Sequence, residues 1–306
     1  MIFSIITPTY NQLDWLRLCI ASVRDQATGF SGLQVEHIVQ DAGSEGIGEF
    51  ARGVGAEFNH NDHQILPPNR SDSVPEIIDR RPYSLKIFSG KDGGMYDAIN
   101  RGLRRSSGQI CAWLNSDEQY LPQTLATVGD FFSSHPRAEM VLGDTIILNE
   151  SLTPCSLRPG VPPIRQYIQA FNLNIHSSSL FFRRSLLDRG ILLGERFRSI
   201  GDSEWIARLL DAGVVIHTVP KTLSTFVLGK RNLSGAVLSS EEKAVWAKEL
   251  PLSTSERALL KARHVFRRFT RGAYRPRYQG VELFTLGDPE RRTAVPPRWL
   301  DFRFRV

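Results

Sequence analysis

The stretch Phe3-Ser4-Ile5-Ile6-Thr7 is made almost entirely of β-branched and aromatic residues, and Pro8 follows it directly. These residue types favour a β-strand. Apolar residues then recur at helical spacing between residues 13 and 23, after Asn11, which we expect to cap the helix. Residues 35–40 form a second apolar run. A strand, a helix and a strand in this order predict a βαβ unit, and therefore an α/β fold with a parallel sheet.

The same alternation continues to about residue 225. We expect strands at residues 84–88, 109–114, 139–142, 178–182 and 214–219, and helices at 93–105, 121–134 and 202–211. The polar segment 58–83 is predicted to be an inserted loop, and the proline-rich segment 151–165 a connection. A change of pattern near residue 235 predicts two parts, an α/β domain (1–235) and a basic, partly helical extension (236–306).

The composition is that of an ordinary globular protein, with 306 residues, 41% of them hydrophobic and 23% charged. Cys19, Cys111 and Cys155 have no paired spacing, which argues against a disulfide framework or a zinc site and favours a reducing compartment. The first residues are interpreted as a strand because they lack the basic region of a signal peptide. No run approaches the roughly 18 apolar residues of a spanning helix, so we expect a cytoplasmic, soluble or peripheral protein.

Polar groups follow the predicted strands at four places. They are Thr7-Pro8-Thr9-Tyr10, Asp41, Lys91-Asp92 and Asn115-Ser116-Asp117. In open parallel sheets, ligands bind outside the carboxyl ends of the strands, so these groups are candidates for one site. Oxygen ligands suit Mg2+ or Mn2+, which proteins usually bind through one or two carboxylates together with substrate phosphates.

Each of these groups also has a purely structural interpretation. Residues 7–10 could be turn chemistry, and Asp41 and Asp92 could cap the segments that follow them. An Asn-Ser-Asp sequence alone is most often a turn. The coincidence of four such sites at strand ends of one sheet favours a functional interpretation.

Four segments of the chain together resemble the family 2 glycosyltransferases, and more narrowly the bacterial enzymes of surface-polysaccharide assembly. They are Ile5–Asn11, Asp41–Ser44, Lys91–Gly102 and Leu114–Glu118. The resemblance spans roughly residues 1–220, and its most specific part is the block Lys91–Gly102. It implies a GT-A fold, an inverting mechanism and a nucleotide-diphosphate sugar donor, as expected of a hexosyltransferase.

The same resemblance implies roles for the residues at the strand ends. Thr7, Pro8, Thr9 and Tyr10 would line the nucleotide pocket, Asp41 and Asp92 would read the base or ribose, and Lys91 would meet phosphate. Asn115-Ser116-Asp117 matches the Asp-x-Asp metal motif of the family, with Asn in the first position. Asp117 would then carry most of the Mg2+ or Mn2+ binding, and Asn115 would bond the ribose or sugar.

In the second half, the segments His176–Ser179 and Gly201–Trp205 are similar to two further family signatures. Asp202 is the expected general base, because an inverting transfer needs one carboxylate within hydrogen-bonding reach of the acceptor hydroxyl. Asp202 could instead only cap the helix that follows, and both roles can hold at once. His176 could orient the acceptor or complete the metal site, or it could be structural.

The Gln-x-x-Arg-Trp motif of processive synthases is absent from the sequence, which favours an enzyme that adds a single sugar. UDP is the expected nucleotide, with GDP and dTDP as alternatives. The expected acceptor is a glycan or a polyprenyl-linked saccharide. Two other functions stay open at this point: a nucleotide-sugar-binding partner subunit without turnover, and a sugar nucleotidyltransferase.

Residues 254–278 contain eight arginines and lysines and one acid, Glu256, with apolar residues between them. A basic amphipathic helix of this kind can lie on an anionic membrane, here the inner face of the cell membrane. The apolar residues could instead pack this helix onto the preceding domain. No nucleic-acid-binding module accompanies the charge, so a nucleic-acid partner is not expected.

Overall fold

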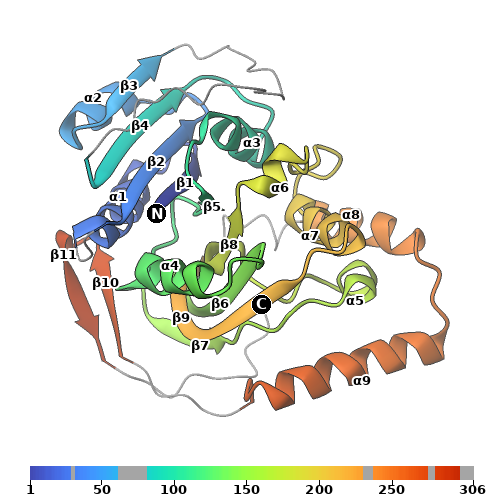
Figure 1. The fold of residues 1–306 in the computed structure, drawn as a ribbon. Helices are drawn as coiled ribbons and strands as arrows, with labels where there is room; N and C mark the ends of the chain where they lie inside the picture. Colours follow the sequence, from blue (N-terminus) through green and yellow to red (C-terminus); the bar gives the residue numbers. More distant parts are fainter. Residues whose placement is uncertain (29–31, 61–80, 230–236, 275–279, 297–306) are drawn as a thin grey trace.

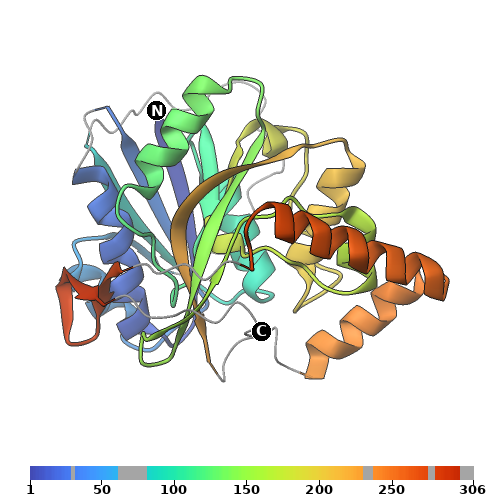
Figure 2. The ribbon, with the colours of Figure 1, turned by 90° about the horizontal axis from the view of Figure 1, so that it is seen from below.

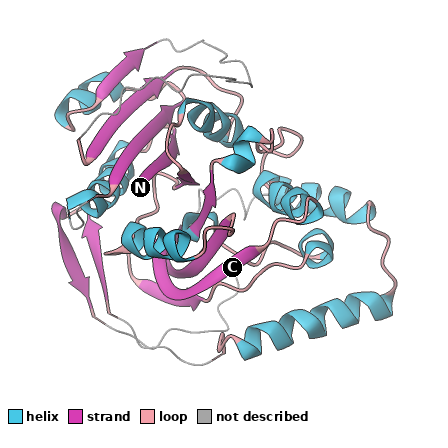
Figure 3. Cartoon of the chain, in the orientation of Figure 1, coloured by secondary structure: helices cyan, strands magenta, loops and turns pink. Residues whose placement is uncertain are grey.

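A nine-stranded mixed sheet runs through the molecule, with helices on both of its faces (Figures 1 and 3). The computed structural model describes residues 1–28, 32–60, 81–229, 237–274 and 280–296. The strand order is β3-β4-β2-β1-β5-β8-β6-β7, with β9 paired to β6.

Five neighbouring strands of the sheet are parallel, as the sequence predicts. They are β3 (Glu57–His60), β4 (Tyr83–Ser89), β2 (Gln34–Asp41), β1 (Ile2–Thr9) and β5 (Ile110–Trp113). β8 (Leu180–Arg183) runs antiparallel between β5 and β6 (Met140–Asn149). β6 also pairs antiparallel with β7 (Pro154–Arg158) and parallel with β9 (Ile216–Leu228).

Side chains of β1 alternate between two hydrophobic cores. Phe3 and Ile5 pack in the core formed with α1 (Leu13–Thr28) and α4 (Thr124–Ser134), whereas Ile6 packs in the core formed with α3 (Met95–Arg105) and α7 (Gly201–Asp211). Successive side chains of a strand point to opposite faces of the sheet, and here both faces are covered. Trp113 and Trp205 stack edge to face at 5.2 Å between ring centroids, which joins β5 to α7.

The strand order reverses between β1 and β5. From β1 the chain moves outward to β2, β3 and β4, and it then returns across β1 to form β5 on the other side. At such a switch point the loops after the two adjacent strands diverge and leave a crevice for a ligand.

Several elements differ from the sequence prediction. The start of the predicted loop 58–83 belongs to strand β3. Residues 61–80 of this predicted loop lie outside the described residues. The predicted connection 151–165 contains β7, which begins at Pro154, a position where an edge strand tolerates proline. β9 runs to Leu228 instead of ending at Val219, and it pairs with β6 along this length with two shifts of register.

The helices also differ in detail. α2 (Ile47–Gly53) was not predicted. α1 begins at Leu13, and the Gln12 carbonyl accepts the N–H of Leu16, so Gln12 rather than Asn11 occupies the capping position. Asn11 has a positive φ of 52° and donates its backbone N–H to Ser44 Oγ.

The C-terminal part contains two helices and a hairpin. α8 (Val237–Lys248) and α9 (Thr254–Thr270) are followed by β10 (Val281–Thr285) and β11 (Asp288–Val295), a pair of strands that was not predicted for the extension. Leu283 of the hairpin packs with Leu18 of α1. Gln119 fixes the hairpin further, because its side chain donates to the Phe284 carbonyl at 2.9 Å and accepts the Phe284 N–H at 3.0 Å.

α9 extends along the edge of the molecule (Figures 1 and 2). Ser253 and Glu256 form a capping box at its start. His264 is buried, but Leu259, Val265, Phe266 and Phe269 are exposed. These four apolar side chains therefore do not pack α9 onto the domain, whereas Leu260, the fifth large apolar residue of the segment, is half-buried. Among the described helices, none has the length and apolar character needed to cross a membrane.

The close contact of α3 with β1 predicts opposite effects of alanine at two helical glycines. A Cβ at Gly102 would lie 2.5 Å from Ile6 Cγ2, whereas one at Gly129 in α4 would have its nearest neighbour at 3.8 Å. Alanine improves helix propensity by about 1 kcal/mol over glycine, but overpacking a core costs about 1–3 kcal/mol. In denaturant titrations we expect Gly102→Ala to destabilise and Gly129→Ala to stabilise. Equal or greater stability of Gly102→Ala would contradict the packing.

Candidate active site

A cavity of about 910 Å3 opens at the switch point, outside the carboxyl ends of β1, β2, β4 and β5. Nine of the twelve residues singled out from the sequence line it: Pro8, Thr9, Tyr10, Lys91, Asp92, Asn115, Ser116, Asp117 and Asp202. Thr7, Asp41 and His176 lie outside the lining. The cavity is within the size range of sites that enclose small-molecule ligands.

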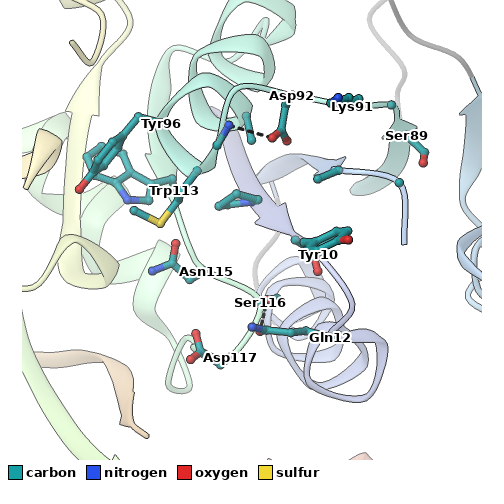
Figure 4. Close-up of a pocket in the computed structure, with 18 of the residues that line it drawn as sticks. Tyr10, Gln12, Ser89, Lys91, Asp92, Tyr96, Trp113, Asn115, Ser116 and Asp117 are labelled. Atoms are coloured by element: carbon teal, nitrogen blue, oxygen red, sulfur yellow. Dashed lines mark hydrogen bonds between the residues drawn. The ribbon is translucent and has the colours of Figure 1, made fainter. Parts of the chain in front are cut away.

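The β1 side of the cavity ends in an exposed aromatic ring. Tyr10 is 59% exposed at the rim, and the buried Thr9 hydroxyl has no hydrogen-bond partner among the described residues. Ser116 Oγ donates to Gln12 Oε1 at 2.8 Å, which ties the loop after β5 to the start of α1 (Figure 4). Thr7 points to the other side, where its hydroxyl bonds His37 Nε2 at 2.9 Å.

Asp41 does not line the cavity but holds lining residues in place through hydrogen bonds. Its fully buried carboxylate accepts the backbone N–H groups of Gly43 and Ser44 and the hydroxyls of Ser44 and Ser89. These four donors occupy the carboxylate, so the predicted contact with a base or ribose would require this network to open.

Lys91 and Asp92 follow β4 at the upper rim (Figure 4). Lys91 is exposed, and Asp92 Oδ1 accepts the Gly94 N–H at 2.9 Å. Partial burial raises the pKa of the Asp92 carboxyl, and the Gly94 hydrogen bond opposes this rise. The pair thus places one cation and one carboxyl at the cavity mouth.

The loop after β5 places Asn115 and Asp117 at the cavity (Figure 4). The buried Glu118 carboxylate accepts the Asn115 backbone N–H at 2.8 Å and the Asn115 side-chain N–H at 3.2 Å. This clamp fixes the orientation of the amide. Asn115 Oδ1 is left buried, with no hydrogen-bond partner among the described residues.

The two adjacent carboxyls of this loop hold protons more tightly than usual. Burial raises the pKa of Asp117 to about 6. Burial, and then the charge of Asp117, raise the pKa of Glu118 well above its usual range. Asp202 contributes to the same rise, so the charge of α7 acts on the β5 loop across the site. A cation placed here would be strongly attracted once the carboxyls ionise.

Asp202 stands in the first turn of α7, and Tyr96 of α3 meets it there. Asp202 Oδ1 accepts the Ser203 N–H at 2.7 Å and the Tyr96 hydroxyl at 3.3 Å. Glycine is needed at position 201, because a Cβ there would lie 2.6 Å from the Tyr96 ring. Burial raises the pKa of the Asp202 carboxyl, and these hydrogen bonds oppose the rise.

Helix α8 holds the segment that leads into Asp202. The Glu242 carboxylate accepts three consecutive backbone N–H groups, those of Arg198, Ser199 and Ile200, at 2.8, 2.9 and 3.2 Å. Charge-assisted hydrogen bonds to backbone N–H groups are among the stronger ones. The C-terminal part of the chain therefore positions a cavity residue.

His176 lies beside the cavity rather than in its lining. Its ring packs against the Phe226 ring at 4.6 Å between centroids, and Phe226 itself lines the cavity. Burial lowers the pKa of His176 to about 4, so the imidazole is neutral at physiological pH. No contact brings it to Asp117 in the described structure, and its role as a metal ligand stays a prediction.

The residues present fit a divalent cation that takes most of its ligands from a substrate. Asp117 offers one carboxylate, and Asn115 Oδ1 is an unpartnered oxygen on the same loop. In the described part of the chain, no three His, Cys, Asp or Glu side chains gather as a complete ligand set. Phosphate and water oxygens would supply the rest, which is the usual arrangement for Mg2+.

Sequence reasoning missed several residues of the lining. Gln12, Tyr96, Trp113, Ser177, Ser199 and Phe226 belong to it. Tyr96 lies within the block Lys91–Gly102, so the family resemblance of that block could have predicted it as a site residue. No sequence pattern indicated Phe226, because it lies on the part of β9 that was not predicted.

The arrangement of the sheet is similar to that of Staphylococcus aureus TarS. The structure of TarS residues 1–349 in complex with UDP-GlcNAc is 19% identical in sequence, with a TM-score of 0.58, and the match covers 88% of this chain and 73% of that one. The complex with UDP gives a TM-score of 0.51, with 81% and 70% covered. The fold is thus of the GT-A type that the sequence predicted.

The family model that matches part of the chain names the class of protein, the glycosyltransferases. Residues 68–193 match the family model Glycosyl transferase family 2, so this part of the chain is similar to a glycosyltransferase domain of that family. This match supports a transferase over the two alternatives left open by the sequence, the subunit without turnover and the nucleotidyltransferase.

Two named biosynthesis proteins are similar in sequence to this chain. The PGL/p-HBAD biosynthesis glycosyltransferase of Mycobacterium bovis is 26% identical over 257 residues, which cover 82% of this chain and 85% of that protein. The minor teichoic acid biosynthesis protein GgaA of Bacillus subtilis is 25% identical over 218 residues, covering 68% of this chain and 43% of that protein.

The raised pKa of Asp117 predicts how stability depends on pH in the absence of metal. A carboxyl whose pKa rises from 3.8 to about 6 on folding stabilises the folded state only at low pH, and this contribution is lost as the pH rises through about 6. We therefore expect Asp117→Asn, in the presence of a chelator, to raise the melting temperature at neutral pH and to flatten its pH dependence. Asp130→Asn, at an exposed site on α4, is the matched control. A lower melting temperature of Asp117→Asn at neutral pH would contradict this account.

Proposed function

We propose that the protein transfers a sugar, with inversion, from a nucleotide-diphosphate sugar to a hydroxyl of a glycan or of a lipid-linked saccharide. The observation that carries the proposal is that one cavity is lined by both Asp117, from the loop after β5, and Asp202, from the first turn of α7. A metal-dependent inverting transfer needs two carboxylates. One binds the cation that holds the diphosphate, and the other takes the proton of the acceptor hydroxyl.

The donor would lie across the ends of β1, β4 and β5. Tyr10 offers an exposed ring for the base, and Lys91 a cation for phosphate. Asn115 Oδ1, which lacks a partner among the described residues, would accept a hydrogen bond from a ribose or sugar hydroxyl. UDP is the favoured nucleotide, and the UDP and UDP-GlcNAc named for the TarS structures agree with this choice.

Asp117 would hold Mg2+ or Mn2+ together with the diphosphate of the donor. When bound, such an ion neutralises the charge that develops on the departing phosphate. Asp117 must be ionised to hold it, so its pKa of about 6 sets the pH range in which binding develops. We leave His176 out of the ligand set because its ring packs on Phe226 outside the lining.

Asp202 would act as the general base. It takes the proton of the acceptor hydroxyl while the oxygen attacks the anomeric carbon, and the bond from that carbon to the diphosphate oxygen breaks, so that the nucleoside diphosphate leaves with the electron pair. Burial raises the pKa of Asp202, which makes it a stronger base than an exposed aspartate. The Ser203 N–H and the Tyr96 hydroxyl hold the same oxygen and orient the carboxylate.

The acceptor is proposed to belong to a cell-surface glycan, with one sugar added per cycle. The names of the two relatives, one in PGL/p-HBAD and one in minor teichoic acid biosynthesis, support this class of product. A polyprenyl-linked acceptor would place the enzyme at the inner face of the cell membrane. The basic segment 254–278, described here as far as residue 274, would be its contact with anionic lipid.

Asp117→Ala should remove the Mn2+-dependent part of UDP binding. The reason is that the cation would lose its only protein carboxylate in the proposed ligand set. Titration calorimetry of UDP with Mn2+ and with a chelator measures the difference, and the wild-type gain from Mn2+ should shrink as the pH falls below about 6. Asp130→Ala serves as the control. An undiminished Mn2+ effect in Asp117→Ala would place the cation elsewhere.

Asp202→Asn should leave donor affinity unchanged but reduce turnover by about 10^2–10^4-fold, the usual contribution of a general base. Calorimetry with UDP and a transfer assay under saturating donor separate the two quantities. Asn keeps the size of the side chain and can still accept the Ser203 N–H, so the fold should be preserved. Retained turnover would assign the base to another residue.

A further inference from the structure

Helix α9 turns its polar and aromatic side toward the rest of the protein. The ring of His264 stacks on that of Tyr167 in α5 (Arg165–Ala170), with 4.0 Å between centroids. Arg257 donates to the Ala170 carbonyl at 3.3 Å, and Lys261 lies 5.0 Å from the centroid of the Phe171 ring. The contact with the domain therefore uses few aliphatic side chains.

The opposite side of α9 is an exposed apolar stripe, which we define as Ala258, Leu259, Ala262, Val265, Phe266 and Phe269. These residues recur at intervals of three and four, so they share one face of the helix. Leu259, Phe266 and Phe269 are 69%, 66% and 69% exposed. Single exposed apolar residues are normal on a surface, but a continuous stripe of them marks an interaction site.

Basic residues border this stripe. Arg263, Arg267 and Arg271 follow one another at intervals of four along one flank. Burial, and then repulsion by Arg263 and Arg271, lower the pKa of Arg267, so the three guanidinium groups are close enough to repel one another. Arg271 donates to the Thr218 hydroxyl of β9, so Arg263 and Arg267 are the guanidinium groups that an anionic partner would meet. Glu256, the only acid in α9, is already engaged with Ser253 in the capping box.

We propose that α9 lies in the plane of an anionic lipid surface, with the apolar stripe inserted among the acyl chains and the arginines at the lipid phosphates. An exposed apolar face flanked by arginine and lysine is the pattern of interfacial helices. Charge complementarity decides against a second copy of the chain as occupant, because symmetric pairing of the stripes would bring two arginine rows together. The proposal extends the membrane location given above by naming the inserted side chains, and its link to catalysis rests on the proposed lipid-linked acceptor.

Flotation of the full chain with lipid vesicles tests this proposal. Vesicles of equal parts phosphatidylcholine and phosphatidylglycerol are compared with vesicles of phosphatidylcholine alone. The test variant is Phe266→Ser/Phe269→Ser, and Arg263→Gln/Arg267→Gln tests the charge. Leu286→Ser is the matched control, because Leu286 is 56% exposed at the β10–β11 turn, away from α9.

The wild type and Leu286→Ser should bind the anionic vesicles. The phenylalanine variant should bind at least about tenfold more weakly, since burial of two aromatic side chains is lost. The arginine variant should lose its preference for the anionic vesicles. High salt should weaken but not abolish wild-type binding, because screening acts on the charges and not on the apolar stripe.

The proposal would be overturned if the wild type did not bind anionic vesicles, or if the phenylalanine variant bound them as well as the wild type. It would also be overturned if the wild type were a dimer that bound no vesicles and the phenylalanine substitutions converted it to a monomer. Slow hydrolysis of a UDP-sugar with Mn2+ is measured on the same samples and should be unchanged by the phenylalanine substitutions. Failure of hydrolysis in the wild type would count against the proposed function alone, since vesicle binding does not depend on it.

Discussion

The buried carboxylate of Asp41 ties together the ends of three strands, and the cavity depends on this tie. Asp41 is the last residue of β2, and its register partners are Thr9 at the end of β1 and Ser89 at the end of β4. It accepts the Ser89 hydroxyl directly, and it accepts the hydroxyl of Ser44, whose Oγ in turn receives the Asn11 N–H. A buried charge is stable only when its hydrogen bonds are satisfied, so this network fixes the ends of the three strands beside one another. The loops after β1 and β4 therefore open into one cavity.

The C-terminal part of the chain braces the two carboxylates on which the proposed chemistry depends. On the β5 side, the hairpin bonds Gln119, two residues after Asp117. Arg292 of the same hairpin donates to the Tyr120 carbonyl at 3.1 Å. On the α7 side, Glu242 of α8 binds the three backbone N–H groups that lead to Asp202. Residues after 235 thus complete the site from outside, although none of the described ones lines the cavity.

The sequence predicted most strands and helices because their apolar periods are long and unbroken. It missed β3 and β7, which are short edge strands, and the second half of β9, which polar and proline residues interrupt. Most of the site was predicted from residues that follow strands, and eight of these line the cavity. The ninth predicted lining residue, Asp202, came from the family resemblance and lies in the first turn of α7. Thr7 does not line the cavity, because it precedes the end of β1 and its hydroxyl bonds His37 inside the protein. The contacts of Tyr96 with Gly201 and Asp202 join segments more than 100 residues apart and could not be predicted from one sequence.

The asparagine in the first position of the Asp-x-Asp motif follows from the burial of Glu118. The Glu118 carboxylate needs donors, and the Asn115 side chain supplies one that an aspartate could not. An aspartate there would set a third carboxylate beside Asp117 and Glu118, whose pKa values burial already raises. Like charges in a buried site oppose each other's ionisation, so it would reduce the charge that Asp117 can offer a cation. Asparagine keeps a side-chain oxygen at this position and adds no charge, which would leave Asp117 as the carboxylate available to the proposed metal ion.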